Sequence, residues 1–228
     1  MNASAALSGI QQQLKAAGFY TGVVDGIWGN GSQGALTACI NAAKGKPVDK
    51  GNLDIAWSAK VSPAFTGRVR LMADQLHMPE GGADWLMACM AFETGETFSP
   101  TIRNGAGAPY YGLIQFGEAA AKDCGTTVAQ LVNMTAEEQL EYVYKYFKPL
   151  TGKLLSVADL YMKILWPVAV GKPDSYVLWD KTSRPTTFAQ NQGLDVNKDG
   201  AITKGEAASK VVDKLNRGLQ PGFRRPLV

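Results

Sequence analysis

The sequence predicts a mainly α-helical protein with a small helical domain followed by a larger one. Apolar residues recur at helical spacing, as Leu7, Ile10 and Leu14 do near the start of the chain. No stretch alternates apolar and polar residues for more than a few positions, as a half-buried strand would. The segment KGKPVDKGN has the polar, Gly- and Pro-containing composition of a linker. The predicted parts are a domain at 1–45, a linker at 46–62 and a second domain at 63–228.

The first domain is expected to contain two helices joined by a compact turn. The first helix ends near Gly18, and the turn FYTGVVDGIWG follows it. Ser32 is a good N-cap for the second helix, whose apolar residues include Ala35 and Leu36. This order of elements suits a small, self-contained unit.

The helix, Asp-Gly turn and helix resemble the bacterial peptidoglycan-binding domain of type 1, a small domain of the three-helix type. The matched positions are Ile10-Gln11, Leu14, Gly18-Phe19-Tyr20, Gly22, Asp25-Gly26-Ile27-Trp28-Gly29 and Ala35-Leu36. The resemblance implies cell-wall contacts from Tyr20, Asp25 and Trp28. Asp25 and Gly26 are expected simply to make the turn, so Tyr20 and Trp28 are the better candidates for ligand contact, although Trp28 is equally suited to fill a small core. The family's Phe-Gln pair is Ile40-Asn41 here.

The larger domain shows a series of helical patterns with recognisable ends. One pattern, from Phe65 to Leu76, ends before Pro79. The stretch TAEE at 135–138 has the spacing of a capping box and opens a strongly periodic helix that Pro149 stops. The stretch SVAD at 156–159 opens another helix, which ends at Trp166-Pro167.

The central element of the larger domain is an apolar helix with a single carboxylate at its end. Asp84 caps this helix, and every position from Trp85 to Phe92 is apolar, which is typical of a helix buried on all sides. Glu93 follows, and a break comes at Gly95. Loss of solvation raises the pKa of a carboxyl group, so Glu93 could hold a proton near neutral pH and serve as a general acid. The alternative is a surface carboxylate at a helix end, which is what most glutamates are.

The segment that follows resembles the signature of soluble lytic transglycosylases, which are relatives of goose-type lysozyme and cut peptidoglycan strands. The matching residues are Glu93, Phe98, Ser99, Pro100, the glycine-rich turn containing Ala106, and Gly112-Leu113-Ile114-Gln115. The resemblance implies a lysozyme-like helical fold, often with a small sheet, and a catalytic role for Glu93. Substrate contacts are expected from Thr94, Ser99, Tyr110, Tyr111 and Gln115. The paired tyrosines could stack on sugar rings.

The chain departs from the transglycosylase pattern in three places. The family's serine after the glutamate is Thr94, and Gly95 and Glu96 shift the local spacing. The downstream motif whose tyrosine positions the catalytic glutamate is missing, so Tyr161, Tyr176 or neither takes that place. The ETG and GLIQ stretches are also similar to chitinase-like endolysins, which leaves a second acid possible at Glu96 or Glu118.

The sequence from Asp195 to Glu206 matches the twelve-position calcium-binding loop of an EF-hand. Oxygen-bearing side chains stand at positions 1, 3, 5, 9 and 12, glycine at 6 and Ile202 at 8. The expected ligands are Asp195, Asn197, Asp199, the carbonyl of Ala201, Thr203 and Glu206. The alternative is an Asp/Asn/Gly turn without metal. Because a single loop lacks the pairing of calcium sensors, a structural role for Ca²⁺ is expected.

Composition narrows the classes of function. A net charge of +3 is too small for a dedicated nucleic-acid binder, and one histidine, His77, excludes a multi-histidine zinc site. Three widely spaced cysteines make neither a disulfide framework nor a metal pattern. No apolar run approaches the roughly 20 residues of a membrane span, and the N-terminus lacks the features of a signal peptide.

Together these features predict a phage-type endolysin, present in the host cytoplasm until release and acting on the cell wall in the periplasm, with no transmembrane segment and acting as a monomer. It would bind peptidoglycan and cut the β-1,4 bond between N-acetylmuramic acid and N-acetylglucosamine, as a lytic transglycosylase or a muramidase. Two alternatives stay open: a chitinase-like glycosidase, and a non-catalytic wall-binding or virion structural protein.

Overall fold

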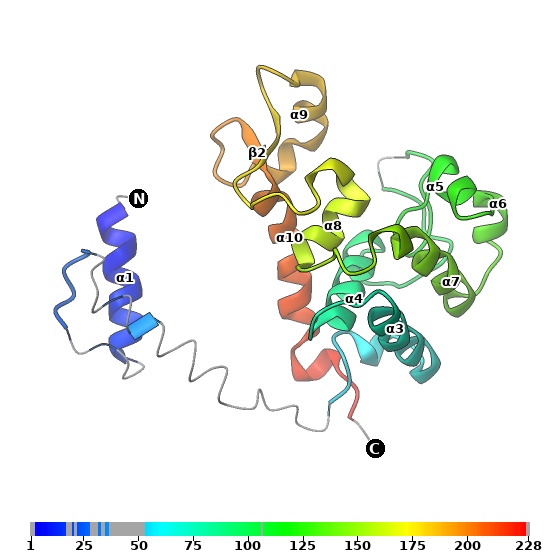
Figure 1. Cartoon of the computed structure of the whole chain (residues 1–228), viewed down its shortest axis with the longest axis horizontal. Coiled ribbons are helices and arrows are strands. Elements are labelled where there is room, and N and C mark those ends of the chain that lie inside the picture. Colours follow the sequence, from blue (N-terminus) through cyan, green and yellow to red (C-terminus); the bar gives the residue numbers. More distant parts are fainter. Residues whose placement is uncertain are drawn as a thin grey trace. The chain divides into compact units, whose positions relative to one another are not determined.

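The computed structural model describes residues 3–16, 20, 22–27, 32, 35–36, 53–105 and 107–226. The chain divides into two compact units, 1–52 and 53–228 (Figure 1). The described residues are mainly helical, with one two-stranded antiparallel sheet in the larger unit. The predicted fold class is confirmed at this level.

The described part of the smaller unit is held together by Gln11 of helix α1 (Ala3–Ala16). The Gln11 side chain is fully buried, and its Oε1 accepts hydrogen bonds from the backbone N–H groups of Asp25 and Gly26. Its Nε2 donates to Asp25 Oδ1, to the Ile27 carbonyl and to Ser32 Oγ. The side-chain amide of Gln11 therefore joins the first helix to the Asp-Gly turn, with both its oxygen and its nitrogen hydrogen-bonded.

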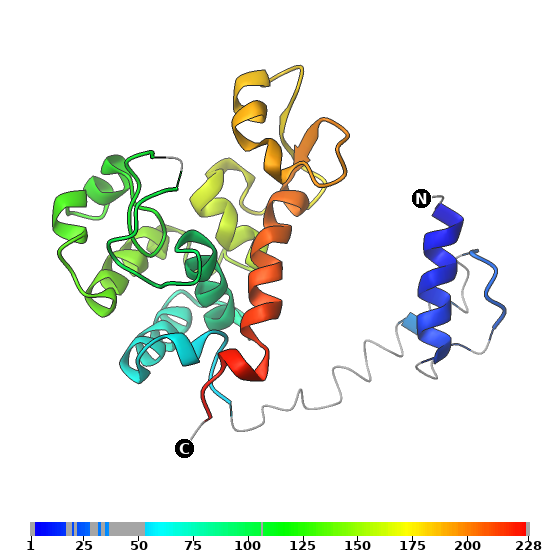
Figure 2. The same cartoon turned by 180° about the vertical axis from the view of Figure 1, so that it is seen from behind.

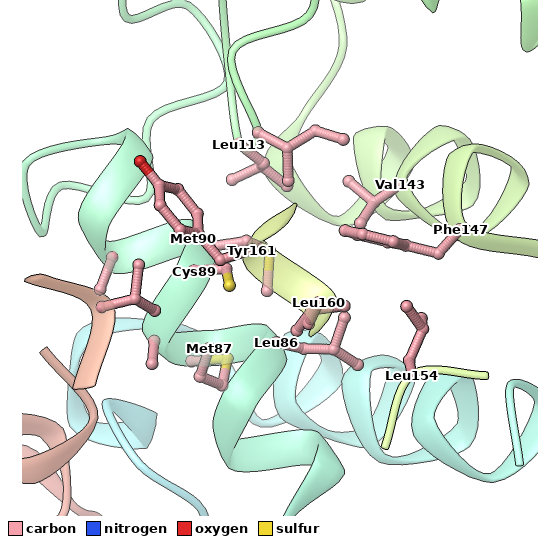
Figure 3. Close-up of a cluster of buried hydrophobic side chains, with 14 of the residues drawn as sticks. Leu86, Met87, Cys89, Met90, Leu113, Val143, Phe147, Leu154, Leu160 and Tyr161 are labelled. Carbon is pink, nitrogen blue, oxygen red and sulfur yellow. The ribbon is translucent and has the colours of Figure 1, made fainter. Parts of the chain in front are cut away.

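The core of the larger unit surrounds α4 (Gly82–Glu93), which packs against α3 (Pro63–Gln75), α8 (Val157–Leu165) and α10 (Lys204–Gly218). Residues 86–91 of α4 are all buried, as the continuous apolar run predicted. Figure 3 shows α4 side chains, including Cys89 and Met90, in one cluster with Leu160 and Tyr161 of α8. Both views of the whole chain show α10 running beside α4 (Figures 1 and 2).

Three further helices follow the loop after α4: α5 (Glu118–Asp123), α6 (Val128–Leu131) and α7 (Ala136–Phe147). Thr135 and Glu138 form the predicted capping box at the start of α7. Helix α7 packs against α3, and its buried face includes Leu140, Val143 and Phe147. This arrangement places the α4–α5 loop among α4, α7 and α8.

The sheet consists of two short strands, β1 (Val177–Asp180) and β2 (Ala201–Thr203). They are antiparallel, with Asp180 opposite Ala201 and Val177 opposite Thr203, and with an irregular register between Val177 and Trp179. Helix α9 (Pro185–Asn191) lies between the strands in sequence. The short 3₁₀ helices are η1 (Ser58–Lys60), η2 (Lys148–Leu150), η3 (Pro167–Ala169), η4 (Gln192–Leu194) and η5 (Pro221–Phe223).

The larger unit begins before residue 63, within the segment assigned to the linker at 46–62. Trp57 is fully buried, and its Nε1 donates to the Lys214 carbonyl at 2.9 Å. Leu53 forms a β-bridge with Pro226, and Asp54 forms an ion pair with Arg70. Residues 53–62 are thus part of the larger unit's structure, and the expected linker was drawn too long at its C-terminal end.

Two of the three cysteines and all of the longer helices of the larger unit lie within the described residues. Cys89 and Cys124 are buried free thiols, and burial is the main cause that raises the pKa of each. Cys39 lies outside the described residues. Among the described helices, none combines the length and apolar character that crossing a bilayer requires.

Candidate active site

Glu93 is the last residue of α4, at the end of a helix whose other side chains form the core. Its carboxyl group is partly buried and makes no hydrogen bond or ion pair with another described residue. Burial raises the pKa of Glu93 from 4.5 to about 8. The group therefore holds a proton at neutral pH, which the apolar run before it predicted.

One buried tyrosine, Tyr161, and one half-buried tyrosine, Tyr146, have their pKa values raised in part by the charge of Glu93. Tyr161 of α8 is 3% exposed, and its ring packs edge-on against Phe92 at a centroid distance of 5.4 Å. Burial and then the Glu93 charge raise the pKa of Tyr161 well above its usual value. Burial, the Cys124 thiolate and the Glu93 charge raise the pKa of Tyr146 on α7 to about 12.

The structure shows which tyrosine lies nearest to the end of α4, where Glu93 stands. Of the two tyrosines named from the sequence, Tyr161 is the one next to the end of α4. Tyr176 instead lies beside Lys172, whose Nζ is 5.8 Å from its ring centroid. Tyr146 was missed, because it stands outside every motif and α7 brings it to the site only in the folded chain.

The Thr94 hydroxyl is engaged within the turn that follows α4. Its side chain is fully buried, and its Oγ1 donates to the Met90 carbonyl at 2.7 Å and accepts from the Phe98 N–H at 3.0 Å. Both hydrogen bonds hold the turn after α4, in which Gly95, Glu96 and Phe98 adopt positive φ angles. The substrate contact expected from Thr94 stays a prediction, and in this structure its hydroxyl shapes the turn that follows Glu93.

Ser99 is also engaged locally, although it is less buried. Its Oγ lies 3.1 Å from Thr101 Oγ1 and accepts from the Thr101 N–H at 3.3 Å. The Ser99 N–H donates to Thr97 Oγ1. These bonds stabilise the turn, and the structure gives Ser99 no direct link to Glu93.

Glu96 is held in ion pairs with α10. Its Oε1 is 2.5 Å from Lys214 Nζ and 3.1 Å from Arg217 Nη1. A carboxylate between two cations is fixed in position and joins the turn after α4 to a helix more than a hundred residues later in the chain. Of the two candidates for a second acid, Glu96 therefore has a structural role.

Glu118 stands in a cavity of about 240 Å³ beside the site. The cavity is lined by residues 114–120, by Tyr110, by Tyr146 of α7 and by Ile164 of α8. Glu93 is not one of the lining residues. Its charge nevertheless contributes to the raised pKa of Tyr146, which does line the cavity. The predicted residues Tyr110 and Gln115 thus line the cavity, with Tyr110 46% exposed.

Tyr111 has a different environment from Tyr110. Its backbone forms β-bridges to Arg103 and to Phe116, and the Arg103 guanidinium carbon is 5.9 Å from its ring centroid. Tyr111 is half-buried and is not part of the cavity lining. The tight turn between the bridges places Gln115 at a positive φ of 55°.

Gln115 has one oxygen without a partner. Its Nε2 donates to the carbonyls of Gly112 and Ile102 at 3.2 and 3.4 Å, which fixes the amide orientation. Its Oε1 is buried and has no hydrogen-bond partner. Buried acceptors are nearly always paired, so Oε1 is suited to accept a hydrogen bond from a bound ligand after a small rearrangement.

Gln139, which sequence reasoning missed, holds the loop that carries these residues. The side chain is fully buried; its Oε1 accepts from the Leu113 N–H at 2.7 Å, and its Nε2 donates to the carbonyls of Pro100 and Leu131. A Cβ at position 112 would lie 2.3 Å from Gln139 Oε1, which explains the glycine there. The available signal was a polar residue on the buried face of α7, one turn before Val143.

The expected calcium loop joins α9 and η4 to α10, so a helical segment stands on each side of it. Gly200, at position 6, has a φ of 92°, and positions 7 to 9 form strand β2. Asp199 Oδ1 accepts from the Ala201 N–H, and Glu206 Oε1 accepts from the Asn197 N–H at 3.4 Å. These contacts hold the loop in a closed turn between η4 and α10.

The loop contains the oxygen donor types that calcium takes in proteins, and one of its carboxylate oxygens is without a partner. Asp195 Oδ1 is buried without a hydrogen-bond partner, and Glu206 at position 12 already reaches back to position 3. Among the described residues, no three His, Cys, Asp or Glu side chains converge as metal ligands do. An EF-hand loop would supplement its carboxylates with the oxygens of Asn197, Ala201 and Thr203, which are outside that set.

The predicted wall-binding residues of the smaller unit are partly used within it. The Tyr20 hydroxyl donates to the Val23 carbonyl at 2.9 Å, and its ring is half-buried. Asp25 Oδ1 accepts from the Ile27 N–H and from Gln11, which lowers the pKa of this exposed carboxyl. Trp28 lies outside the described residues.

Comparison with known proteins adds no family to this description. No protein-family model matches the chain, and no curated protein shows significant sequence similarity to it. The chemistry of the site is therefore inferred from the geometry of the site itself. That geometry combines a protonated carboxyl group with a neighbouring cavity lined by aromatic, amide and carboxylate side chains.

Proposed function

We propose that the larger unit is a peptidoglycan glycosidase that cuts the β-1,4 bond between N-acetylmuramic acid and N-acetylglucosamine. The observation that carries this proposal is Glu93, a carboxyl group at the end of a buried helix with its pKa raised to about 8. Glycosidic bonds need a proton on the leaving oxygen, and a carboxyl that keeps its proton at neutral pH can supply it. The likeness of residues 93–116 to the lytic transglycosylase signature supports this choice of substrate.

The reaction begins with proton transfer from Glu93 to the bridging oxygen. The bond from C1 of the muramic residue to that oxygen breaks, the N-acetylglucosamine end leaves as an alcohol, and positive charge develops at C1. The substrate's own N-acetyl oxygen stabilises this charge. Glu93, now a carboxylate, takes the proton from the muramoyl 6-hydroxyl, whose oxygen bonds to C1 and gives a 1,6-anhydro end.

The same first step can lead to hydrolysis if the carboxylate takes its proton from water instead. The product is then a reducing end, heavier by one water than the anhydro form. In the alternative scheme Glu118, the solvent-exposed carboxylate in the neighbouring cavity, takes that proton in place of Glu93, and Glu93 then regains its own proton from solvent. Mass spectrometry of the released muropeptides distinguishes the two outcomes directly.

In the whole chain, the proposed roles are those of an endolysin. The smaller unit binds peptidoglycan and holds the larger unit at its polymeric substrate. The protein acts as a monomer, stays in the host cytoplasm until release and then acts on the wall in the periplasm. A calcium ion held by Asp195, Asn197, Asp199, Ala201, Thr203 and Glu206 would stabilise the C-terminal part of the larger unit.

The test is a comparison of the wild type with Glu93→Gln on purified peptidoglycan. Glutamine keeps the shape of the side chain but has no proton to donate, and loss of general acid catalysis lowers the rate by roughly 10²–10⁴-fold. Glu141→Gln is the matched control, since this exposed carboxyl on α7 makes only an (i, i+4) ion pair. Glu118→Gln tests the second carboxylate.

Three results would change the proposal. Full activity in folded Glu93→Gln would place the acid elsewhere. A folded wild type that binds peptidoglycan and never clears it would favour a wall-binding or virion structural protein. Equal cleavage of N-acetylglucosamine polymers would favour a chitinase-like glycosidase.

A further inference from the structure

A free ammonium group lies against the wall of the cavity beside Glu93. Lys163, near the C-terminal end of α8, places its Nζ 4.5 Å from the centroid of the Tyr146 ring. Tyr146 and the next residue on α8, Ile164, both line the cavity. The Tyr146 hydroxyl donates to the Lys163 carbonyl at 2.7 Å, so the ring and the lysine are fixed to each other.

Apart from the Tyr146 ring, the Lys163 ammonium has no anionic partner among the described residues. Neighbouring Lys145 forms an ion pair with Glu141 at 3.7 Å, and Lys204 and Lys214 pair with Asp159 and Glu96. In the described part of the chain, Lys163 makes no ion pair, and no side-chain hydrogen bond is formed by its ammonium. Lys163 is partly exposed and is not itself a lining residue, but its ammonium lies over the ring of Tyr146, which lines the cavity.

We propose that Lys163 recognises a carboxylate on the glycan substituent next to the cleaved bond, and that this contact favours muramic-acid polymers over uncharged ones. This inference rests on the proposed function, because it names the part of the substrate that the neighbouring cavity takes. The stem peptide of peptidoglycan carries free carboxylates, whereas N-acetylglucosamine polymers carry none. A cation beside the cavity would therefore raise the affinity for peptidoglycan fragments relative to that for uncharged N-acetylglucosamine polymers.

The other titratable groups at the cavity are compatible with an approach from the Lys163 side. Tyr146, which lines the cavity, is neutral, since its pKa is about 12, and Glu93, which is outside the lining, is largely protonated near neutral pH. Glu118, at the start of α5, is the one carboxylate among the described lining residues, and it is exposed. An anionic ligand would avoid Glu118 and gain from Lys163, which sets its orientation in the cavity.

The experiment measures binding, so it does not depend on cleavage. The probe is a disaccharide–tetrapeptide fragment of peptidoglycan, used as the free acid and with its carboxylates methyl-esterified. The full chain carrying Glu93→Gln is the parent, compared with Lys163→Met and Lys163→Arg in the same background. Lys148→Met is the matched control, because that ammonium lies over Tyr144, which lines a different cavity.

Esterification is expected to weaken binding to the parent by roughly twofold to fivefold at low salt, which is typical of a partly exposed ion pair. Lys163→Met should bind both forms as weakly as the parent binds the ester, while Lys163→Arg and Lys148→Met should keep the preference. Equal affinity of the parent for both forms, or an undiminished preference in Lys163→Met, would overturn the inference.

The failure of the two proposals can be told apart. Carboxylate-dependent binding that needs Lys163, in a wild-type protein unable to cleave the wall, would overturn the glycosidase and leave the recognition site. Wall cleavage by the wild type with no role for Lys163 in binding would overturn the recognition site alone. No binding of either fragment would overturn the recognition site, and the cleavage assay would then judge the glycosidase by itself.

Discussion

Lys204 and Asp159 form an ion pair inside the larger unit, with Nζ 2.5 Å from Oδ1 and side chains 3% and 9% exposed. Lys204 is the first residue of α10 and directly follows Thr203 of the expected calcium loop. Its Nζ also donates to the Lys172 carbonyl, and Asp159 accepts from the Gly171 N–H. The pair connects the loop to α8, two residues before Tyr161 at the site.

Lys204→Met should lower the free energy of unfolding by about 3–5 kcal/mol, because it leaves a buried carboxylate without its main partner. Urea denaturation of the larger unit measures this. Adding Asp159→Asn to Lys204→Met should recover part of the loss by removing the buried charge. Glu141→Gln, which breaks an exposed pair with Lys145, should change stability by less than about 1 kcal/mol. A loss below 1 kcal/mol in Lys204→Met would contradict the prediction.

Glu93→Gln should be more stable than the wild type at neutral and alkaline pH. The folded pKa of Glu93, about 8, lies above the reference value of 4.5, so the folded state keeps a proton that the unfolded state releases. The wild type thus loses stability as pH rises from about 4.5 to about 8. Since the side chain keeps an edge toward solvent, we expect a gain on the order of 2 kcal/mol at pH 8 in the variant, and none at pH 4. Equal stability of the two proteins across this range would show that Glu93 is not destabilised by burial.

The rate of bond cleavage should depend on the protonated form of Glu93. We expect kcat/KM to be level across neutral pH and to fall about tenfold per unit above a pKa of about 8. The profile is measured on soluble glycan fragments, so that changes in the charge of the wall do not contribute. A fall centred near pH 4 or 5 with no alkaline limb would point to a different acid.

Local chemistry explains which features were predictable. The apolar run of α4 and the capping box at Thr135 each lie within about a dozen residues, and both have the predicted structure. The position of Glu93 was predictable for the same reason: its burial follows from the helix that carries it. The mainly helical class follows from the same short-range patterns.

Long-range pairings explain what was missed. Glu96 meets Lys214, and Trp57 meets Lys214 and Gly218, across more than a hundred residues, and no local pattern encodes such contacts. Nothing in the sequence around Gln139 indicates its role, because its partners Leu113 and Pro100 come from a loop more than 25 residues earlier in the chain. Strands β1 and β2 have four and three residues, too short for an alternating pattern to be recognised.

The boundary at residue 53 predicts different outcomes for two truncations. A protein of residues 53–228 should fold and keep its catalytic activity, with weaker binding to insoluble peptidoglycan, because the first 52 residues form a separate unit. A protein of residues 63–228 should be less stable by roughly 3–5 kcal/mol or more, since it loses the buried Trp57 together with Asp54 and Ser58. Thermal melting and sedimentation with peptidoglycan measure the two effects. Equal stability of the two proteins would mean that 53–62 contribute nothing, and undiminished sedimentation of 53–228 would refute wall binding by the smaller unit.

Calcium should stabilise the larger unit through the loop from Asp195 to Glu206. Three carboxylates in one loop repel each other, and a divalent cation removes this repulsion. The cation would also give Asp195 Oδ1, which has no hydrogen-bond partner, a positive charge to coordinate. Because only the folded loop presents the donors together, calcium well above its dissociation constant should raise the melting temperature by mass action. Magnesium should substitute poorly, since it is smaller and sheds water reluctantly.

Glu206 is expected to contribute to stability in two ways, as a calcium ligand and as part of the N-terminal cap of α10. The rise in melting temperature on adding calcium measures the first contribution alone. Glu206 also accepts hydrogen bonds from Thr203 at the start of α10, so Glu206→Ala should melt lower even in chelator. Its calcium increment should vanish, whereas that of Glu141→Gln should equal the wild type. Glu93 lies far along the chain from this loop, so we expect calcium to change stability more than turnover. Superimposable melting curves of the wild type in calcium and in chelator would sink the assignment of a calcium site.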